Sequence, residues 1–326
     1  MTSLDGVRAR FAHNEGLPFT NVLTESSIRE VLNEYGVKFR DRVFNPVTTI
    51  WGFLSQVLND DHSCRDAVSR IIAHRATNHH TVCSPNTASY CRARGRICTS
   101  VLSTLASRTA EELQASSADQ WKWNARSVFI VDGSTVSMPD TPENQEKYPQ
   151  PPQQSPGLGF PLARIAVLLS LATGACHDLA IASYQGKGTG ETNLFRQMYK
   201  TLKAGDVVLA DALFDDYFVT CELCTRNIDI VARAQYERSK SRIAQSRPND
   251  DIIVWQRPTK PRGMTREKHQ SYPKELVMRQ ITVDARDKNN RVKQFKVVTT
   301  ILDTSIDGHK IGCLLGNHEE LCVDIR

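Results

Sequence analysis

The stretch Arg126-Ser-Val-Phe-Ile-Val-Asp-Gly-Ser-Thr-Val-Ser-Met138 decides how the rest of the chain is interpreted. Four of the five residues from Val128 to Asp132 are apolar, and the run then breaks into Asp132-Gly-Ser-Thr135. Such a β-branched and aromatic run predicts a buried strand, and Gly133 marks its expected end. A carboxylate held there by a rigid backbone suits a hard divalent cation. Taken alone, an Asp-Gly pair more often only opens a turn.

A second apolar run ends in the same way. Gly205-Asp-Val-Val-Leu-Ala-Asp-Ala-Leu-Phe214 predicts a strand that terminates at Asp211, and we expect a helix from Ala212 to Arg226. Two strand-end aspartates suggest a pair of carboxylates that converge at one edge of a sheet. Carboxylates that hold Mg²⁺ ions are what phosphoryl transfer needs, because the metals activate the attacking oxygen and stabilise the leaving one.

These two blocks, Ile-Val-Asp-Gly-Ser-Thr around Asp132 and Val-Leu-Ala-Asp-Ala-Leu-Phe around Asp211, resemble the first two acidic blocks of DDE transposases. The most similar group is the IS-four family of bacterial insertion sequences. The segment Gly157-Leu-Gly-Phe-Pro-Leu-Ala-Arg-Ile-Ala-Val-Leu-Leu-Ser170 resembles the family's stretch before the second acid. Lys296-Val-Val-Thr-Thr-Ile-Leu-Asp303 resembles the strand before the third. The resemblance covers roughly residues 125–305.

The resemblance implies a transposase with an RNase H-like catalytic core. Its implied chemistry is Mg²⁺-dependent (or Mn²⁺-dependent) cleavage of DNA strands at element ends, followed by attack of the 3′-hydroxyl on target DNA. Asp132 and Asp211 would be catalytic metal ligands. The implied partner is double-stranded DNA, as insertion-sequence ends and target, with a homodimer as a possible assembly.

The family's third block carries Tyr-x-x-Arg-x-x-x-Glu-x-x-x-x-x-x-Lys, and it is incomplete here. Glu319 and Glu320 are the only glutamates after Asp303, and Glu320 is our stand-in for the third catalytic acid. Counting back from Glu320, Gly316 stands at the Arg position and Cys313 at the Tyr position. We therefore expect a truncated or frame-shifted chain with weak cleavage.

Two other interpretations remain open from the sequence. One is a catalytically inactive remnant that only binds DNA and occupies element ends. The other is a metal-dependent nuclease unrelated to mobile DNA, which would share the two aspartates without specificity for element ends.

Composition is that of an ordinary globular protein, with 326 residues, 40% hydrophobic and 24% charged. No apolar run approaches the roughly 20 residues that span a membrane, and the first residues lack a signal-peptide core, so we expect a cytoplasmic protein without membrane contact. The nine scattered cysteines do not predict a disulfide framework. The pair Cys221-Glu-Leu-Cys224 is better explained by packing in a helix than by zinc.

The chain is predicted to be organised as a helical N-terminal domain, residues 1–120, and an α/β domain, residues 125–326. Helices are expected at Ser26–Tyr35, Thr49–Leu58, Ser63–Ala76, Tyr90–Ala106 and from about Ser107 to Ser116. The N-terminal domain is a candidate DNA-binding domain because arginines recur on these helices (Arg65, Arg70, Arg75, Arg92, Arg94 and Arg96). Packing helices with solvated arginines are the alternative, since no turn signature isolates a recognition helix.

In the α/β domain we expect a hairpin from Leu162 to Ser183, a helix from Glu191 to Leu202 and a strand at Ile228–Ala232. With the two acidic strands, this order resembles an RNase H-like core. Residues 139–161, rich in Pro and Gln, are expected to form an extended, mobile loop.

Residues 233–295 are assigned to the mostly β insertion that contacts DNA in the resembling family. The formal net charge of the whole chain is only +5, but its positive charge is concentrated in one segment. Residues 226–296 carry 18 Lys or Arg against 8 Asp or Glu. A local positive region is what binding to a phosphate backbone requires, although a solvated polar face explains it too. The predicted DNA contacts are Arg233, Arg238, Lys240, Arg242 and Arg257. Tyr236 and Trp255 could stack on a base, with core packing at least as good an explanation for Trp255.

Overall fold

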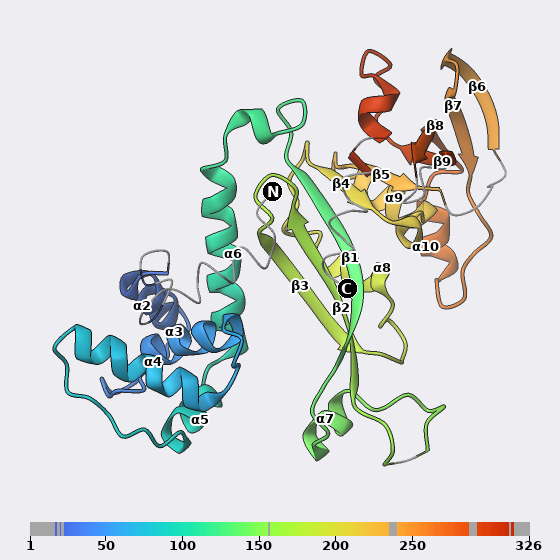
Figure 1. Ribbon diagram of the computed structural model, residues 1–326. Helices are drawn as coiled ribbons and strands as arrows, with labels where there is room; N and C mark the ends of the chain where they lie inside the picture. Colours follow the sequence, from blue (N-terminus) through green and yellow to red (C-terminus); the bar gives the residue numbers. More distant parts are fainter. Residues whose placement is uncertain are drawn as a thin grey trace. The chain divides into compact units, whose positions relative to one another are not determined.

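The computed structural model describes residues 17, 20, 23–155, 157–234, 240–286, 292–312 and 314–315. The chain divides into two compact units, Met1–Glu112 and Leu113–Arg326. Figure 1 shows helices in the first unit and a long sheet in the second. Within the described ranges, no helix is long and apolar enough to cross a membrane.

Three helices of the N-terminal unit begin at a capping side chain. Thr24, Asn45 and Ser63 each accept a hydrogen bond from the backbone N–H three residues later, which satisfies a donor that the first helical turn leaves free. The helices are α2 (Glu25–Glu34), α3 (Pro46–Leu58), α4 (Cys64–Thr77), α5 (Ala88–Arg94) and α6 (Thr99–Ala115), the last of which runs past the unit boundary.

The core of this unit forms where α3 and α4 approach closely. A Cβ at Gly52 of α3 would stand 2.7 Å from Cδ1 of Ile71, so the glycine permits the contact. Ile28, Val47 and Tyr90 are buried in the same cluster. Helical spacing predicted the first three helices with bounds within three residues of the observed ones.

The expected boundaries of the last two helices are wrong. The chain breaks at Gly95–Cys98, where the carbonyl of Cys98 accepts from Val101 and Leu102 and begins α6. Glycine is a poor helix former, which accounts for the break. No break occurs near Thr109, whose hydroxyl donates to the carbonyl of Leu105 within the helix and does not cap a new one.

In the second unit, a short 3-10 turn η1 (Asp119–Trp121) precedes a mixed sheet. The described strands are β1 (Val128–Ser137), β2 (Leu162–Ser170), β3 (Cys176–Ser183), β4 (Val207–Ala210), β5 (Asp229–Arg233), β6 (Lys240–Arg247), β7 (Asp250–Gln256), β8 (Glu275–Arg286) and β9 (Val292–Thr299). Their order across the sheet is β3-β2-β1-β4-β5-β9-β8-β7-β6.

The first five strands have RNase H-like topology. β1, β2 and β3 are antiparallel neighbours, whereas β4 and β5 run parallel to β1. The helices α8 (Glu191–Gln197) and α9 (Tyr217–Cys224) make the connections and pack in the core beneath this part of the sheet. The fold is therefore α/β, with an RNase H-like core preceded by helices, as the resemblance implied.

Residues 233–295, assigned to the insertion, contain β6, β7, β8, the short helix α10 (Arg266–Ser271) and the start of β9. These strands do not form a separate layer. β9 pairs antiparallel with β5, and β8, β7 and β6 follow in a meander that continues the same sheet (Figure 1). Trp255 of β7 is only 2% exposed and lies in the core, so packing is the correct explanation for this residue.

Two local expectations around the aspartates are corrected. β1 does not end at Gly133 but continues to Ser137, because it stays paired with β2 along that length. The expected helix after Asp211 is divided into η2 (Ala212–Phe214) and α9, because Asp216 caps α9 by accepting from the N–H groups of Phe218 and Val219.

Residues 139–161 are not simply extended. They contain α7 (Pro142–Lys147), and Gln150 organises the loop that follows. Its side-chain oxygen accepts from the N–H groups of Gly157 and Gly159, and its amide donates to the carbonyls of Gln154 and Ser155. The side chain thus satisfies backbone groups that a loop without regular pairing leaves open.

Candidate active site

Asp132 and Asp211 occupy neighbouring positions on parallel strands. β1 and β4 pair from Val128 opposite Val207 to Val131 opposite Ala210, and each aspartate is the next residue along its strand. Adjacent strands in a sheet lie about 4.8 Å apart, so the backbones of the two aspartates are separated by about that distance. The pairing with β4 ends here, while β1 continues along β2.

The two carboxylates also belong to the same face of the sheet. Side chains alternate between faces along a strand. One core cluster contains Val128 and Ile130 of β1 together with Val207 and Leu209 of β4. The alternate residues of the two strands belong to the cluster on the opposite face. Asp132 is two residues after Ile130, and Asp211 is two residues after Leu209. Both aspartates therefore lie on the same face as these two residues, just beyond the last apolar side chain of each strand on that face.

Each acid is held locally by a backbone donor. Oδ1 of Asp132 accepts from the N–H of Gly133 at 2.8 Å, and the residue is 5% exposed. Oδ1 of Asp211 accepts from the N–H of Leu213 at 2.8 Å and thereby caps η2. These contacts leave Oδ2 of Asp132 without a protein hydrogen bond among the described residues, so that oxygen can take another ligand.

The helix that follows β9 covers the same face as the two acids. Residues 308–312 and 314–315 are helical, and Ile311, Leu314 and Leu315 are buried in the cluster that contains Ile130 and Leu209. The described part of this helix carries no acid, and Glu320 lies outside the described residues. Over the ranges described, no group of three Asp, Glu, His or Cys side chains stands close enough to hold one metal ion.

A buried arginine fixes the turn that leads into this helix. Arg279 is 0% exposed, and its guanidinium donates to both oxygens of Asp250, at 2.8 and 2.6 Å. It also donates to the carbonyls of Asp303, at 2.7 Å, and Ile306, at 2.8 Å. Close packing at Gly312, where a Cβ would meet Val283 at 2.5 Å, sets the helix on β8.

Sequence reasoning missed Glu191, the first residue of α8. A Cβ at Gly133 would stand 2.3 Å from Cδ of Glu191, so this carboxyl group packs directly on the backbone next to Asp132. Gly133 points to the face opposite Asp132, and the carboxylate of Glu191 lies there, 3.9 Å from Nε of Arg164. The glycine after the first aspartate was the available signal, because a close approach often requires glycine.

The predicted DNA contacts fall in different places. Ala232 of β5 pairs with Ala210 of β4, and Arg233 and Asp211 are the residues that follow them. Arg233 therefore extends across the sheet the row that Asp132 and Asp211 begin. It is exposed and lies over the ring of Phe295, 5.7 Å from the centroid. Arg257 instead donates to the carbonyls of His269 and Tyr272, at 3.1 and 2.7 Å, near the end of α10.

The other three predicted contacts surround the start of β6. Lys240 and Arg242 are on this strand, which forms one edge of the sheet, but their side chains lie outside the described part of the structure. Arg238 and Tyr236 belong to the undescribed residues 235–239 altogether.

Comparison with known families adds to this geometry. The sequence of residues 123–315 matches the family described as Transposase DDE domain, which accounts for more than half of the chain. The chain belongs to the DDE transposase family. No curated protein matches the chain in sequence. The finer assignment of this DDE transposase to the IS-four group stays a prediction.

The family uses divalent metal ions, and the acid pair of this DDE transposase suits such an ion in part. Mg²⁺ and Mn²⁺ prefer carboxylate oxygens, and two carboxylates on one face of adjacent strands can share a cation. Asp132 and Asp211 are the residues that would hold it. The rest of the coordination would come from water, DNA phosphate or a further acid.

Proposed function

We propose that this DDE transposase cleaves DNA strands at the ends of an insertion sequence and joins them to target DNA, with Mg²⁺ or Mn²⁺ held by Asp132 and Asp211. The observation that carries the proposal is the register of β1 and β4, which brings the two acids together on one face. The family match supports a transposase and does not favour a protein that only binds DNA.

The bound ion would lower the pKa of the attacking hydroxyl and neutralise charge on the phosphate. Asp132 and Asp211 contribute fixed negative oxygens, since both sit at the edge of a rigid sheet and each is oriented by a backbone N–H. We assign the third catalytic acid to Glu320 on the resemblance of the acidic blocks alone, because this residue lies outside the described ranges.

Arg233 is proposed to bind the DNA phosphate next to the scissile bond. Its position, one strand beyond Asp211 in the same row, places a permanent cation beside the two acids. A guanidinium matches the geometry of phosphate oxygens and stays charged at all relevant pH values. Lys240, Arg242 and Arg238 would extend the interaction along the DNA backbone, whereas Arg257 donates to backbone carbonyls at the end of α10.

Two measurements test this function. Titration calorimetry with Mn²⁺ alone should detect binding to the full chain, and Asp132→Asn and Asp211→Asn should each weaken it. The same variants should lower the cleavage of DNA that carries the element's own ends by at least 100-fold, since each removes a charged ligand. Asp284→Asn, at an exposed acid on β8, is the matched control.

Cleavage that persists in both aspartate variants would refute the assignment. DNA binding without cleavage in either metal would instead support a protein that only occupies element ends.

A further inference from the structure

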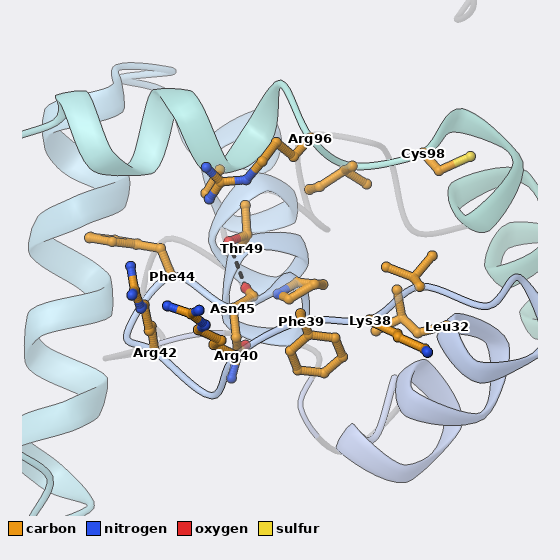
Figure 2. Close-up of a pocket in the computed structure, with 14 residues that line it drawn as sticks. Leu32, Lys38, Phe39, Arg40, Arg42, Phe44, Asn45, Thr49, Arg96 and Cys98 are labelled. Carbon is orange, nitrogen blue, oxygen red and sulfur yellow. Dashed lines mark hydrogen bonds between the residues drawn. The ribbon is translucent and has the colours of Figure 1, made fainter.

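A pocket of about 430 Å³ in the N-terminal unit has a strongly positive lining. Four cations and no carboxylate contribute to it, and the cations are Lys38, Arg40, Arg42 and Arg96. Figure 2 shows the side chains of Arg40, Arg42 and Arg96 on the same side of the pocket as Phe44, whereas Lys38 extends toward the other side. The pocket lies between the segment before α3 and the turn that joins α5 to α6.

These four cations differ from the other basic residues of the unit. Arg29, Arg70 and Arg108 form ion pairs with Glu25, Asp66 and Glu34. The four pocket cations are exposed, and no described residue forms an ion pair or a side-chain hydrogen bond with them. Four positive charges held around one depression without counter-charges repel each other, and an anion in the pocket would relieve that repulsion.

The one acid within this segment faces a different partner. Asp41 lies between Arg40 and Arg42 in sequence, but its Oδ1 accepts from the side-chain amide of Asn45 at 2.7 Å. The same oxygen is 3.7 Å from Nη2 of Arg29. Asp41 is thus paired with Arg29 and does not line the pocket.

The start of α3 adds to the positive potential. Asn45, Pro46 and Thr49 line the pocket, so the N-terminal end of a 13-residue helix is part of its wall. The aligned peptide dipoles give that end a partial positive charge, which stabilises an anion nearby. Phe39 and Phe44 contribute apolar surface to the same lining.

We propose that this pocket binds backbone phosphates of double-stranded DNA, an interaction that rests on the proposed function because that function makes DNA the partner. Guanidinium groups bind phosphate oxygens through paired N–H donors, and phosphates project from a duplex toward exposed cations. Such interactions are independent of base sequence and fix the position of a protein on the duplex. The pocket therefore gives the N-terminal unit a DNA-binding site apart from the acid pair.

The first test is the salt dependence of DNA binding by the full chain, measured by fluorescence anisotropy on a duplex. The double variant Arg40→Ala/Arg42→Ala should bind more weakly, and the slope of log K against log salt should fall by roughly 0.9 for each phosphate that the variant no longer neutralises. The control Arg108→Ala removes an arginine of the same unit that is paired with Glu34 and does not line the pocket, and it should keep the wild-type slope. Equal effects in the two variants would overturn the proposal.

The second test uses a thiol at the pocket. Cys98 is exposed and lines the pocket, and hydrogen bonds from Ser100 lower the pKa of its thiol, which favours alkylation. Iodoacetamide should modify Cys98 several-fold more slowly when a duplex is bound, with Cys176 of the second unit unchanged as the reference. Protection by a mononucleotide but not by a duplex would overturn the proposal in favour of a small-molecule site.

The two levels of inference fail in different ways. A chain that binds no duplex at all refutes the proposed function together with this pocket. A chain that binds and cleaves DNA with an unchanged salt slope in Arg40→Ala/Arg42→Ala, and with Cys98 unprotected, refutes the pocket alone.

Discussion

Arg279 of β8 and Asp250 of β7 form a buried ion pair, with Nη2 and Oδ2 separated by 2.6 Å and the two side chains 0% and 5% exposed. The remaining donors of the guanidinium reach the carbonyls of Asp303 and Ile306. The pair therefore joins β7 and β8 to the turn before the helix that covers the face with Asp132 and Asp211.

Breaking this pair should destabilise the second unit strongly. Arg279→Met removes the guanidinium that neutralises the buried carboxylate of Asp250 and is expected to lower the free energy of unfolding by about 3–5 kcal/mol. Urea denaturation measures the change. The double variant Arg279→Met/Asp250→Leu removes both charges and should recover part of the loss, and a single variant as stable as wild type would contradict this role.

Gly133 should tolerate a methyl group only when Glu191 is shortened. In Gly133→Ala the new Cβ meets the carboxyl group of Glu191 at 2.3 Å, so that side chain must move. We expect a cost of about 1–3 kcal/mol in the free energy of unfolding. Gly133→Ala combined with Glu191→Ala should cost less than the two single changes together. Additive costs in this double-mutant cycle would show that the two residues are not coupled.

Acid should weaken the contacts that Glu222 makes between α9, α8 and the end of α10. Burial of this carboxylate opposes its charge, but hydrogen bonds from Tyr272 and Arg196 more than compensate and hold its pKa below the ordinary value of 4.5. The group joins α9 to α8 and to the end of α10. A pKa that is lower in the folded than in the unfolded chain gives stability that is complete above pH 4.5 and is lost as the pH falls through the folded value.

Glu222→Gln tests this dependence. The variant should lose about 1.5–3 kcal/mol of unfolding free energy at pH 7, the usual contribution of hydrogen bonds to a charged group. The difference from wild type should shrink as the pH falls below 4.5, the ordinary pKa of the group. Urea midpoints across the acidic range up to neutral pH provide the measurement. Glu146→Gln, at an exposed acid of α7, is the control and should follow wild type throughout.

The basic segment should dominate the salt dependence that the second unit contributes to DNA binding. Replacing Arg233, Arg238, Lys240 and Arg242 by alanine is expected to flatten log K against log salt, by roughly 0.9 for each phosphate left without a cation. Arg257→Ala should mainly lower stability, because its guanidinium donates to backbone carbonyls. An unchanged slope in the fourfold variant would mean that these residues only solvate the surface.

The local pattern of apolar residues was sufficient to predict many of the helices and strands of this protein. Apolar runs predicted the strands that carry Asp132 and Asp211, and helical spacing predicted α2, α3 and α4, because burial of one face or of a whole strand leaves its period in the sequence. The resemblance of the acidic blocks predicted the family and the RNase H-like core. Boundaries were weaker, as Gly133 shows, since the pairing with β2 carries β1 past that glycine.

Tertiary structure alone decided which distant residues meet. The register of parallel strands makes Asp132, Asp211 and Arg233 neighbours in one row, and register depends on packing across the sheet rather than on local sequence. The contact of Glu191 with Gly133, the buried position of Arg279 and the pocket that collects Arg40, Arg42 and Arg96 have the same origin. The sequence does not distinguish a charged residue that is paired inside the protein from one that is available to a ligand. Only the fold determines which charged residues are paired and which are available.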